Sequence, residues 1–299
     1  MESARDKHTC EIIEAENLWM LDDVDTDGYE CWGCGITMQP AAWEKDKKVR
    51  AYFKKKRHTK HLPDCDADAE SAIVRQGQKK SVRHILDSAP GLSPSGLKLI
   101  DKRPTIDLDL TGGASKPSST RPASSSLSEG NAPTRESRRQ VNSIRQICRA
   151  FIRFPHDRDM SLNVPGVAGN NYMTIFKKIK PPIQLYPDAK IFYAQLLWQR
   201  LSYDDELLII PLSGEWEGGK PSKIYQIHIE WAHWSKAKRT VLRKELEAAQ
   251  EEAKDAKDKG QQDKAWVFFM GEQDIDNQEI FYVTDYRLIC SIMGYITYS

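Results

Sequence analysis

The chain has almost no net charge and no long apolar run. Among its 299 residues, 44 Lys and Arg stand against 43 Asp and Glu, which leaves a formal net charge of +1. Its mean hydropathy is −0.62, and no stretch approaches the roughly 20 apolar residues that cross a bilayer. We therefore expect no membrane-spanning segment, and any attraction to a polyanion has to come from a local cluster of charge.

Cysteine is also sparse, and several common enzyme signatures are missing. Six cysteines are too few for a disulfide framework in a chain of this length. The N-terminal residues contain neither an apolar stretch nor a small-residue cleavage site, so we expect a reducing, cytoplasmic location. The chain has no phosphate-binding Gly-x-x-x-x-Gly-Lys-Ser/Thr loop, no nucleophile elbow and no dinucleotide glycine fingerprint, which argues against the common ATPase, hydrolase and dehydrogenase classes.

Composition predicts two folded parts joined by a flexible linker. In residues 111–139, 20 of 29 residues are Gly, Ala, Ser, Thr or Pro, and the only large apolar side chain is Leu127. Such a segment buries too little surface to offset its chain entropy. We therefore predict a module at 1–110, a linker at 111–139 and a second, independent module at 140–299.

The second module is predicted to be mainly β, with one long helix. Its runs of β-branched, aromatic and aliphatic residues are separated by Gly and Pro turn signals; they are Ile144–Phe154, Tyr172–Ile179, Ile191–Trp198, Glu206–Leu212, Lys223–Trp231, Ala265–Met270 and Ile280–Ile292. By contrast, residues 235–259 are strong helix formers without Gly or Pro. Apolar residues thin out after Leu246, so the second half of this helix is expected to project into solvent or to bind a protein partner.

Four potential metal ligands lie in two pairs of the first module. Cys31 and Cys34 have two residues between them, a spacing that lets both sulfurs reach one ion. His61 and Cys65 form a second pair, whose spacing would place both side chains on one face of a helical turn. We predict that these four residues bind one structural Zn²⁺, with His58 as the alternative histidine ligand. Four protein ligands leave no open position for a catalytic water.

This pattern resembles the zinc-finger module of competence-protein (CoiA-like) sequences and related bacterial proteins of mobile elements and phage defence. The resemblance rests on Cys31 and Cys34, the basic aromatic segment with Tyr52 and Phe53, and the pair His61 and Cys65. It covers about 40 residues and implies a treble-clef-like finger with a link to nucleic acid. The predicted fold class is therefore α+β: a small treble-clef-like zinc finger plus a mainly β domain, an OB-like barrel or a sandwich, with one long charged helix.

The positive charge of the first module is concentrated between the two ligand pairs. From Glu44 to His61 there are nine Lys or Arg and two acids. Lysines and arginines release counterions from phosphates, and nearby rings can stack on unpaired bases. We predict that the module binds DNA or RNA through Lys47, Lys48, Arg50, Tyr52, Lys54, Lys55, Lys56, Arg57 and Lys60.

The resulting hypothesis is a non-catalytic zinc-finger nucleic-acid-binding protein of bacterial phage defence or mobile-element biology. One alternative is a protein-protein adaptor that uses the helix at 235–259 and keeps the finger as a purely structural element. A second alternative is a metal-dependent nuclease whose Mg²⁺ site draws on Asp204, Asp205, Glu215, Glu217 and Lys220.

Overall fold

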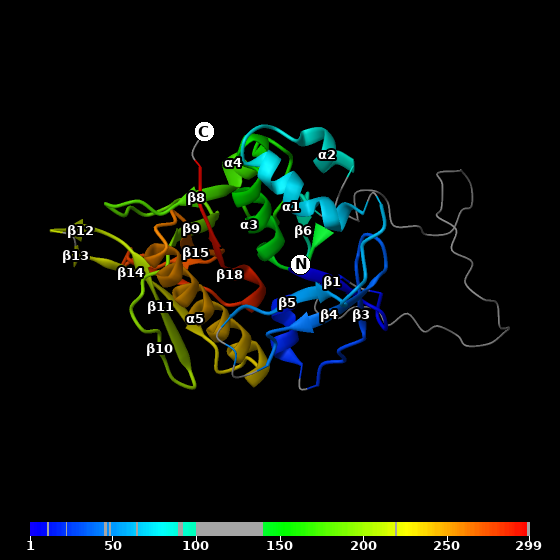
Figure 1. Ribbon diagram of the computed structural model, residues 1–299. Coiled ribbons are helices and arrows are strands. Elements are labelled where there is room, and N and C mark those ends of the chain that lie inside the picture. Colours follow the sequence, from blue (N-terminus) through cyan, green and yellow to red (C-terminus); the bar gives the residue numbers. More distant parts are fainter. Residues whose placement is uncertain are drawn as a thin grey trace.

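The computed structural model describes residues 1–10, 12–21, 23–44, 47, 49–63, 65–88, 92–99, 140–218 and 220–297. The predicted linker at 111–139 and Lys48 lie outside the described residues. The fold is α+β, with more strands than helices and one long helix, α5. Figure 1 shows the N-terminal sheet on one side of the molecule and the larger β part on the other, with α5 running between them. No helix in the described part of the chain combines the length and apolar character that a bilayer crossing requires.

The N-terminal part is a five-stranded sheet with a small core. The sheet has the order β2-β1-β3-β4-β5, and all its pairs are antiparallel. Its elements are β1 (Ser3–Asp6), β2 (Ile12–Glu14), the 3-10 helix η1 (Ala15–Met20), β3 (Tyr29–Glu30), β4 (Thr37–Ala41) and β5 (Tyr52–Lys55). Leu18, Met38 and Phe53 fill the core between the sheet and η1. Because this core is small, additional restraints add to the stability of the sheet.

Two helices that follow the N-terminal sheet pack against the second part of the chain. These are α1 (Asp66–Gly77) and α2 (Arg83–Ser88). Ile73 and Leu86 share a core with Ile147 and Phe151 of helix α3 (Ile144–Arg153). A Cβ at Gly77 would lie 2.5 Å from the ring of Phe154, so the two segments are in close contact. The two sides of the predicted linker therefore share a core, an arrangement that the sequence analysis did not anticipate.

The helix α3 corrects the strand predicted at 144–154. The residues that are buried against the core recur at 144, 147, 148, 151 and 152, which is the spacing of one helical face. The prediction relied on the β-branched and aromatic content of this run and missed its period. The run at 172–179 is likewise divided, because a short helix α4 (Tyr172–Ile175) precedes strand β8 (Phe176–Lys178).

The β part contains two main sheets. A four-stranded sheet has the order β18-β15-β9-β8, and a five-stranded sheet has the order β10-β11-β14-β17-β16. The longer strands are β9 (Ile191–Gln195), β11 (Leu207–Ser213), β14 (Ile224–Glu230), β15 (Lys264–Phe269) and β18 (Ile289–Gly294). The shorter elements are β6 (Gly96–Leu97), β7 (Gln140–Val141), η3 (Pro155–Asp157), β10 (Ser202–Tyr203), β12 (Trp216–Glu217), β13 (Lys220–Pro221), β16 (Glu272–Gln273), β17 (Ile280–Tyr282) and η4 (Tyr286–Leu288).

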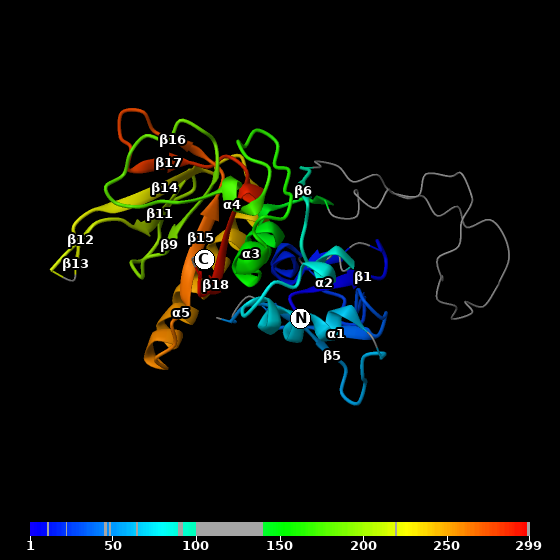
Figure 2. The same ribbon diagram turned by 90° about the horizontal axis from the view of Figure 1, so that it is seen from above.

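The four-stranded sheet is buried on both faces. Along β15, Trp266 and Phe268 point into the core that contains α3, whereas Val267 and Phe269 point into the core formed with the five-stranded sheet. This alternation follows from the two-residue period of a strand. The sheet is thus the central layer of the molecule, with helices on one side and a second sheet on the other (Figure 2).

The helix α5 (Lys236–Asp258) confirms the helix predicted at 235–259 and begins at the N-cap Ser235. Its apolar side chains pack on the core between the two sheets, whereas Val241 packs on the N-terminal core. The second half of the helix is also packed, since Ala249, Gln250 and Ala253 are buried. The small alanine side chains let the helix lie close to the sheet, so the expectation of a solvent-projecting half is wrong.

A buried ion-pair cluster joins the N-terminal sheet to α3 and α5. We use this name for Glu14, Glu16, Arg145, Arg149 and Glu245, whose residues are at most 8% exposed. The Nε of Arg145 lies 2.7 Å from Glu14, a terminal nitrogen of Arg145 donates to Glu245 at 2.7 Å, and Arg149 donates to Glu16 at 2.8 Å. At the rim, Glu2 pairs with Arg149 and Arg153, and Arg50 pairs with Glu252 and Glu16.

Candidate metal centre

The first ligand pair lies on a tight turn between β3 and β4. The backbone N–H of Cys31 donates to the carbonyl of Ile36, and the N–H of Gly35 donates to the carbonyl of Cys31, both at 2.8 Å. Gly35 has φ of +73°, a left-handed conformation that glycine adopts without steric cost. The turn therefore holds the sulfurs of Cys31 and Cys34 on one side of the chain.

The second ligand pair lies on the turn that leads into α1. The N–H of Cys65 donates to the carbonyl of Leu62 at 3.2 Å, and Cys65 is the N-cap residue of the helix. The predicted helical turn from His61 to Cys65 is therefore wrong, because α1 begins only at Asp66. Pro63 precedes the helix and does not interrupt its hydrogen bonds.

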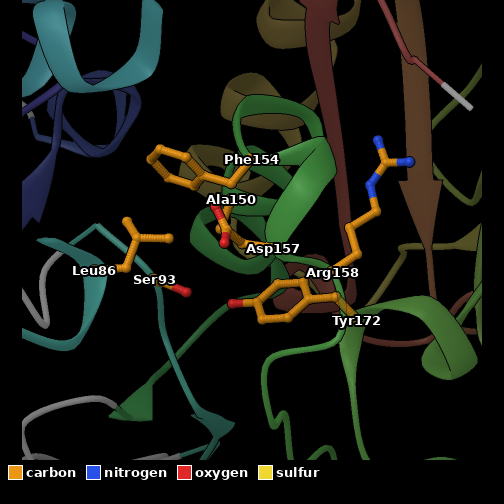
Figure 3. Close-up of a pocket in the computed structure, with 7 residues that line it drawn as sticks. All are labelled: Leu86, Ser93, Ala150, Phe154, Asp157, Arg158 and Tyr172. Carbon is orange, nitrogen blue, oxygen red and sulfur yellow. The ribbon is translucent and has the colours of Figure 1, made fainter. Parts of the chain in front are cut away.

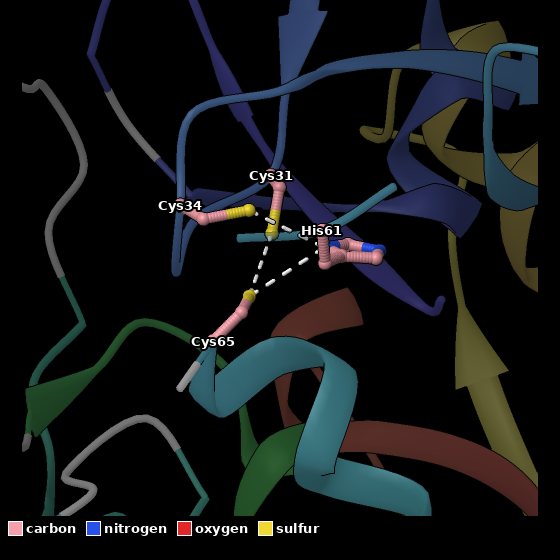
Figure 4. Close-up of side chains that lie close together, drawn as sticks. All are labelled: Cys31, Cys34, His61 and Cys65. Carbon is pink, nitrogen blue, oxygen red and sulfur yellow. Dashed lines mark hydrogen bonds between the residues drawn. The ribbon is translucent and has the colours of Figure 1, made fainter. Parts of the chain in front are cut away.

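The four side chains converge on one point, as Figure 4 shows. Their donor atoms all lie within 4.8 Å of one another. The sulfurs of Cys31 and Cys65 are 3.6 Å apart, and Nδ1 of His61 lies 3.3 Å from the sulfur of Cys34 and 3.5 Å from that of Cys65. For metal–ligand bonds of about 2.3 Å to sulfur and about 2.0 Å to nitrogen, the edges of a tetrahedron measure about 3.8 Å and about 3.5 Å. These three distances are close to the edges of a tetrahedral ion site, and the remaining donor pairs lie within 4.8 Å.

His61, and not His58, is the histidine of this cluster. The alternative ligand His58 is exposed, stands at φ of +69° on the turn that follows β5, and is absent from the cluster. Within the described residues, the four residues Cys31, Cys34, His61 and Cys65 are the one group of His, Cys, Asp and Glu close enough to hold an ion.

Backbone amides stabilise negative charge on the sulfurs of Cys31 and Cys34 to different degrees. Burial raises the pKa of Cys31 to about 12, although the N–H groups of Cys34 and Gly33 face its sulfur and oppose this effect. Burial also acts to raise the pKa of Cys34, but hydrogen bonds from the backbone of Leu62 and Ile36 and from His61 outweigh it and lower the pKa to about 6. Cys34 is therefore converted more easily than Cys31 to the thiolate that a metal requires.

Gly33 allows the two ligand pairs to approach. A Cβ at this position would lie 3.0 Å from the sulfur of Cys65 and 3.1 Å from the backbone nitrogen of Ala67. A side chain at position 33 would push the start of α1 away from the turn that carries Cys31 and Cys34. The spacing of the site thus depends on close contact between the β3–β4 turn and α1.

The predicted nucleic-acid contacts fall into three groups. Lys47, Tyr52, Lys54, Lys55, Lys56, Arg57 and Lys60 are exposed on and around β5. Arg50 instead turns inward and donates to Glu252 at 2.9 Å, with its side chain 18% exposed. Lys48 lies outside the described residues. Arg50 is therefore engaged in ion pairs, whereas the described lysines and arginine that follow it up to Lys60 are exposed.

The acids of the nuclease alternative do not converge. Asp204 and Asp205 precede β11, whereas Glu215 and Glu217 follow it. The seven residues of β11 separate these two groups by about 20 Å at 3.3 Å per residue. Asp204 accepts hydrogen bonds from the N–H groups of two following residues. The side chain of Lys220 lies outside the described part of the chain.

A small pocket beside α3 serves packing (Figure 3). It is lined by Leu86, Ser93, Ala150, Phe154, Asp157, Arg158 and Tyr172. Asp157 accepts hydrogen bonds from Ser81 and from the N–H of Val82, and thereby holds the start of α2. The hydroxyl of Tyr172 donates to the carbonyl of Pro94. These polar groups are thus engaged with the protein itself.

The charged residues that the sequence analysis missed are those of the buried ion-pair cluster. Arg145, Arg149 and Arg153 recur every four residues along α3, so they lie on one helical face. This period was the available signal, but the partners Glu14 in β2 and Glu16 in η1 are more than a hundred residues away in the sequence. Spacing alone does not identify partners at that separation.

No protein-family model, curated protein or solved structure matches this chain.

Proposed function

We propose that this protein is a zinc-stabilised nucleic-acid-binding protein in which the metal centre positions a basic surface. Zn²⁺ is the ion that best suits three thiolates and one imidazole at tetrahedral spacing. Three elements follow one another as in a treble-clef finger: the turn with Cys31 and Cys34, the hairpin β4–β5 and the start of α1 at Cys65. Because four protein ligands fill the coordination sphere, the ion would have a structural role.

The observation that carries the proposal is the place of the basic residues. Lys54 and Lys55 end strand β5, Lys56, Arg57 and Lys60 lie between β5 and the ligand His61, and all five are exposed. A metal bound at His61 would fix one end of this segment, and the pairing of β5 with β4 fixes the other. A fixed array of cations gives a polyanion a preorganised surface and releases its counterions on binding.

The surroundings of α5 give less support to the adaptor alternative. The apolar side chains of this helix pack on the two sheets and on the N-terminal core. The helix therefore has few apolar side chains left for a partner. In the described residues, a bridge between Leu196 and Leu212 joins the two sheets of the β part. The description of this part as an OB-like barrel or a sandwich stays a prediction.

Metal analysis of the purified protein tests the first half of the proposal. We expect one zinc per chain, and loss of this zinc in Cys34→Ser. The matched control is Cys10→Ser, because Cys10 is exposed and is not part of the cluster. A metal-free wild-type protein, or equal zinc content in the two variants, would contradict the proposal.

Oligonucleotide binding at several salt concentrations tests the second half. Replacing Lys54, Lys55, Lys56 and Arg57 together with Glu should abolish binding, and the wild-type affinity should fall with salt with a logarithmic slope of about −4. The control replaces Lys79, Lys80, Lys259 and Lys264 with Glu, which changes the net charge equally at exposed positions elsewhere. Equal affinity of the two variants would reject the basic segment as the contact surface. Intact oligonucleotides after incubation with Mg²⁺ or Mn²⁺ would reject the nuclease alternative.

A further inference from the structure

The basic residues after β5 form a narrow turn with an arginine at its tip. We call residues 54–60 the basic turn. The N–H and the hydroxyl of Thr59 both donate to the carbonyl of Lys56, at 3.0 and 2.6 Å, and so close the turn around Arg57 and His58. Figure 2 shows the chain after β5 projecting from the body of the molecule. Arg57 and His58 are thus presented at the end of a protruding turn, which strand β5 enters and an irregular segment leaves towards His61.

Both ends of the basic turn are held by the fold. Lys55 is the last residue of β5 and pairs with Met38 of β4. At the other end, His61 belongs to the candidate metal centre. His58 has a left-handed backbone, a conformation that a non-glycine residue keeps only where the surrounding structure imposes it. The tip is therefore a positioned element and not a free tail.

The charge of the basic turn is barely neutralised by the described residues. Lys56 lies 3.8 Å from Asp27, and both side chains are more than half exposed, so this pair is weak. No ion pair within the described part of the chain joins Lys54, Lys55, Arg57 or Lys60 to an acid. Their cations are available to an external polyanion.

Resting on the proposed function, we infer that the basic turn enters the major groove of double-stranded DNA, where Arg57 contacts base edges and the flanking lysines contact phosphates. The major groove of B-form DNA is wide enough for a helix or a two-stranded ribbon and so also for a narrow turn, and a guanidinium that donates to O6 and N7 of guanine is the commonest specific contact there. Arg57 stands at the tip, as a base contact requires, and the lysines stand on the flanks, where the groove walls carry phosphates.

The surroundings of the turn favour duplex DNA over the other nucleic acids. Surfaces that bind single strands present several aromatic rings in succession. Among the described N-terminal residues, the exposed aromatic side chain near the basic turn is Tyr52, which lies at the far end of β5. The major groove of an RNA duplex is deep and too narrow for side chains to read. A protruding turn with an arginine tip therefore fits a DNA duplex best.

The test uses the full chain and three probes of one sequence: a DNA duplex, the corresponding RNA duplex and the DNA single strand. We expect the DNA duplex to bind most tightly. A second step selects preferred sequences from a randomised DNA duplex pool with the wild type, Arg57→Lys and Lys54→Ala. All substituted residues are exposed, and the zinc content of each variant checks its fold.

The two variants should differ in kind. Arg57→Lys keeps the charge but loses the paired donors, so the preference at one base pair should fall roughly ten-fold while affinity for the random pool stays within about two-fold. Lys54→Ala should weaken binding to all sequences alike and reduce the salt slope by about one. Tighter binding of the single strand or the RNA duplex, no sequence preference, or an unchanged preference in Arg57→Lys would overturn the inference and leave the proposed function intact. Failure to bind any of the three probes would overturn both.

Discussion

Two arginines of the same basic stretch have opposite environments. Arg50 turns into the protein and pairs with Glu252 and Glu16, whereas Arg57 stands at the tip of an exposed turn. Both arginines have lysines nearby, although Arg50 lies between Val49 and Ala51 whereas Arg57 directly follows three lysines. The difference comes from distant carboxylates: Glu252 belongs to α5, and the described residues bring no carboxylate to Arg57. Local sequence sets the density of charge, but tertiary partners decide whether a charge serves the fold or faces solvent.

The two regions also differ in what their charges contribute. Removing charges from water costs several kcal/mol per ion, and a buried pair recovers this cost only with good geometry. The buried ion-pair cluster therefore contributes chiefly to the placement of the N-terminal sheet on α3 and α5. The charges of the basic turn are exposed in the free protein, so they incur no such desolvation cost. They therefore contribute to binding.

The largest effect is expected from Arg145→Ala. This change leaves Glu14 and Glu245 buried without their shared cation, which should lower the free energy of unfolding by about 3 to 5 kcal/mol. Arg57→Ala is the control and should change it by less than about 0.5 kcal/mol. Urea unfolding of the two variants measures both values. Similar free energies of unfolding in the two variants would contradict the distinction between the buried ion-pair cluster and the basic turn.

A pair of glutamates inside the cluster gives the next prediction. Burial acts to raise the pKa of Glu16, but Arg149, Arg145 and Arg50 outweigh it and lower the pKa to about 2. Burial raises the pKa of Glu14 above its usual value, because the neighbouring arginines do not compensate fully. The charged form is thus favoured at Glu16 and disfavoured at Glu14.

The pH dependence of stability should reflect this difference. The stabilisation by Glu16 is present above pH 4.5 and lost as the pH falls towards 2; it amounts to about 3 kcal/mol. The contribution of Glu14 has the opposite sign, since it is present at low pH and lost as the pH rises through the raised pKa. At pH 7, Glu16→Gln should therefore destabilise the protein, whereas Glu14→Gln should be neutral or stabilising. Thermal unfolding at pH 7 and pH 3 would contradict this account if the two variants behaved alike.

Much of the candidate metal centre could be predicted from sequence, because its four donors lie within 35 residues and their spacing is restrictive. The helix at 236–258 was equally accessible from its composition. The helix α3 was missed because its content of Ile and Phe resembles that of a strand, although its period is helical. The partner of Arg50 could not be identified from the local sequence, since Glu252 is 202 positions away.

Arg50 offers a smaller but more selective test. Arg50→Ala removes a charged hydrogen bond to Glu252 at the rim of the cluster, which should cost about 2 kcal/mol of stability. Its effect on the salt slope of oligonucleotide binding should be negligible, whereas Lys54→Ala should reduce that slope by about one. The comparison fails if Arg50→Ala changes the slope as much as Lys54→Ala does.

The smallest effect concerns Asp27, the exposed acid beside Lys56. Asp27→Asn should leave the free energy of unfolding within about 0.5 kcal/mol of wild type. By removing a negative charge next to the basic turn, it should strengthen oligonucleotide binding by about two-fold at low salt and not at high salt. Weaker binding of this variant would indicate that Asp27 orients the turn and does not merely oppose its charge.

The long helix α5 touches the N-terminal core through Val241, the buried ion-pair cluster through Glu245 and the core between the two sheets through Leu246. Parts of the chain that are far apart in sequence therefore lose contacts together whenever this helix detaches. Heating should accordingly melt the protein in a single calorimetric peak, and a limited digest should not release a stable N-terminal fragment even when the protease cuts between the two halves.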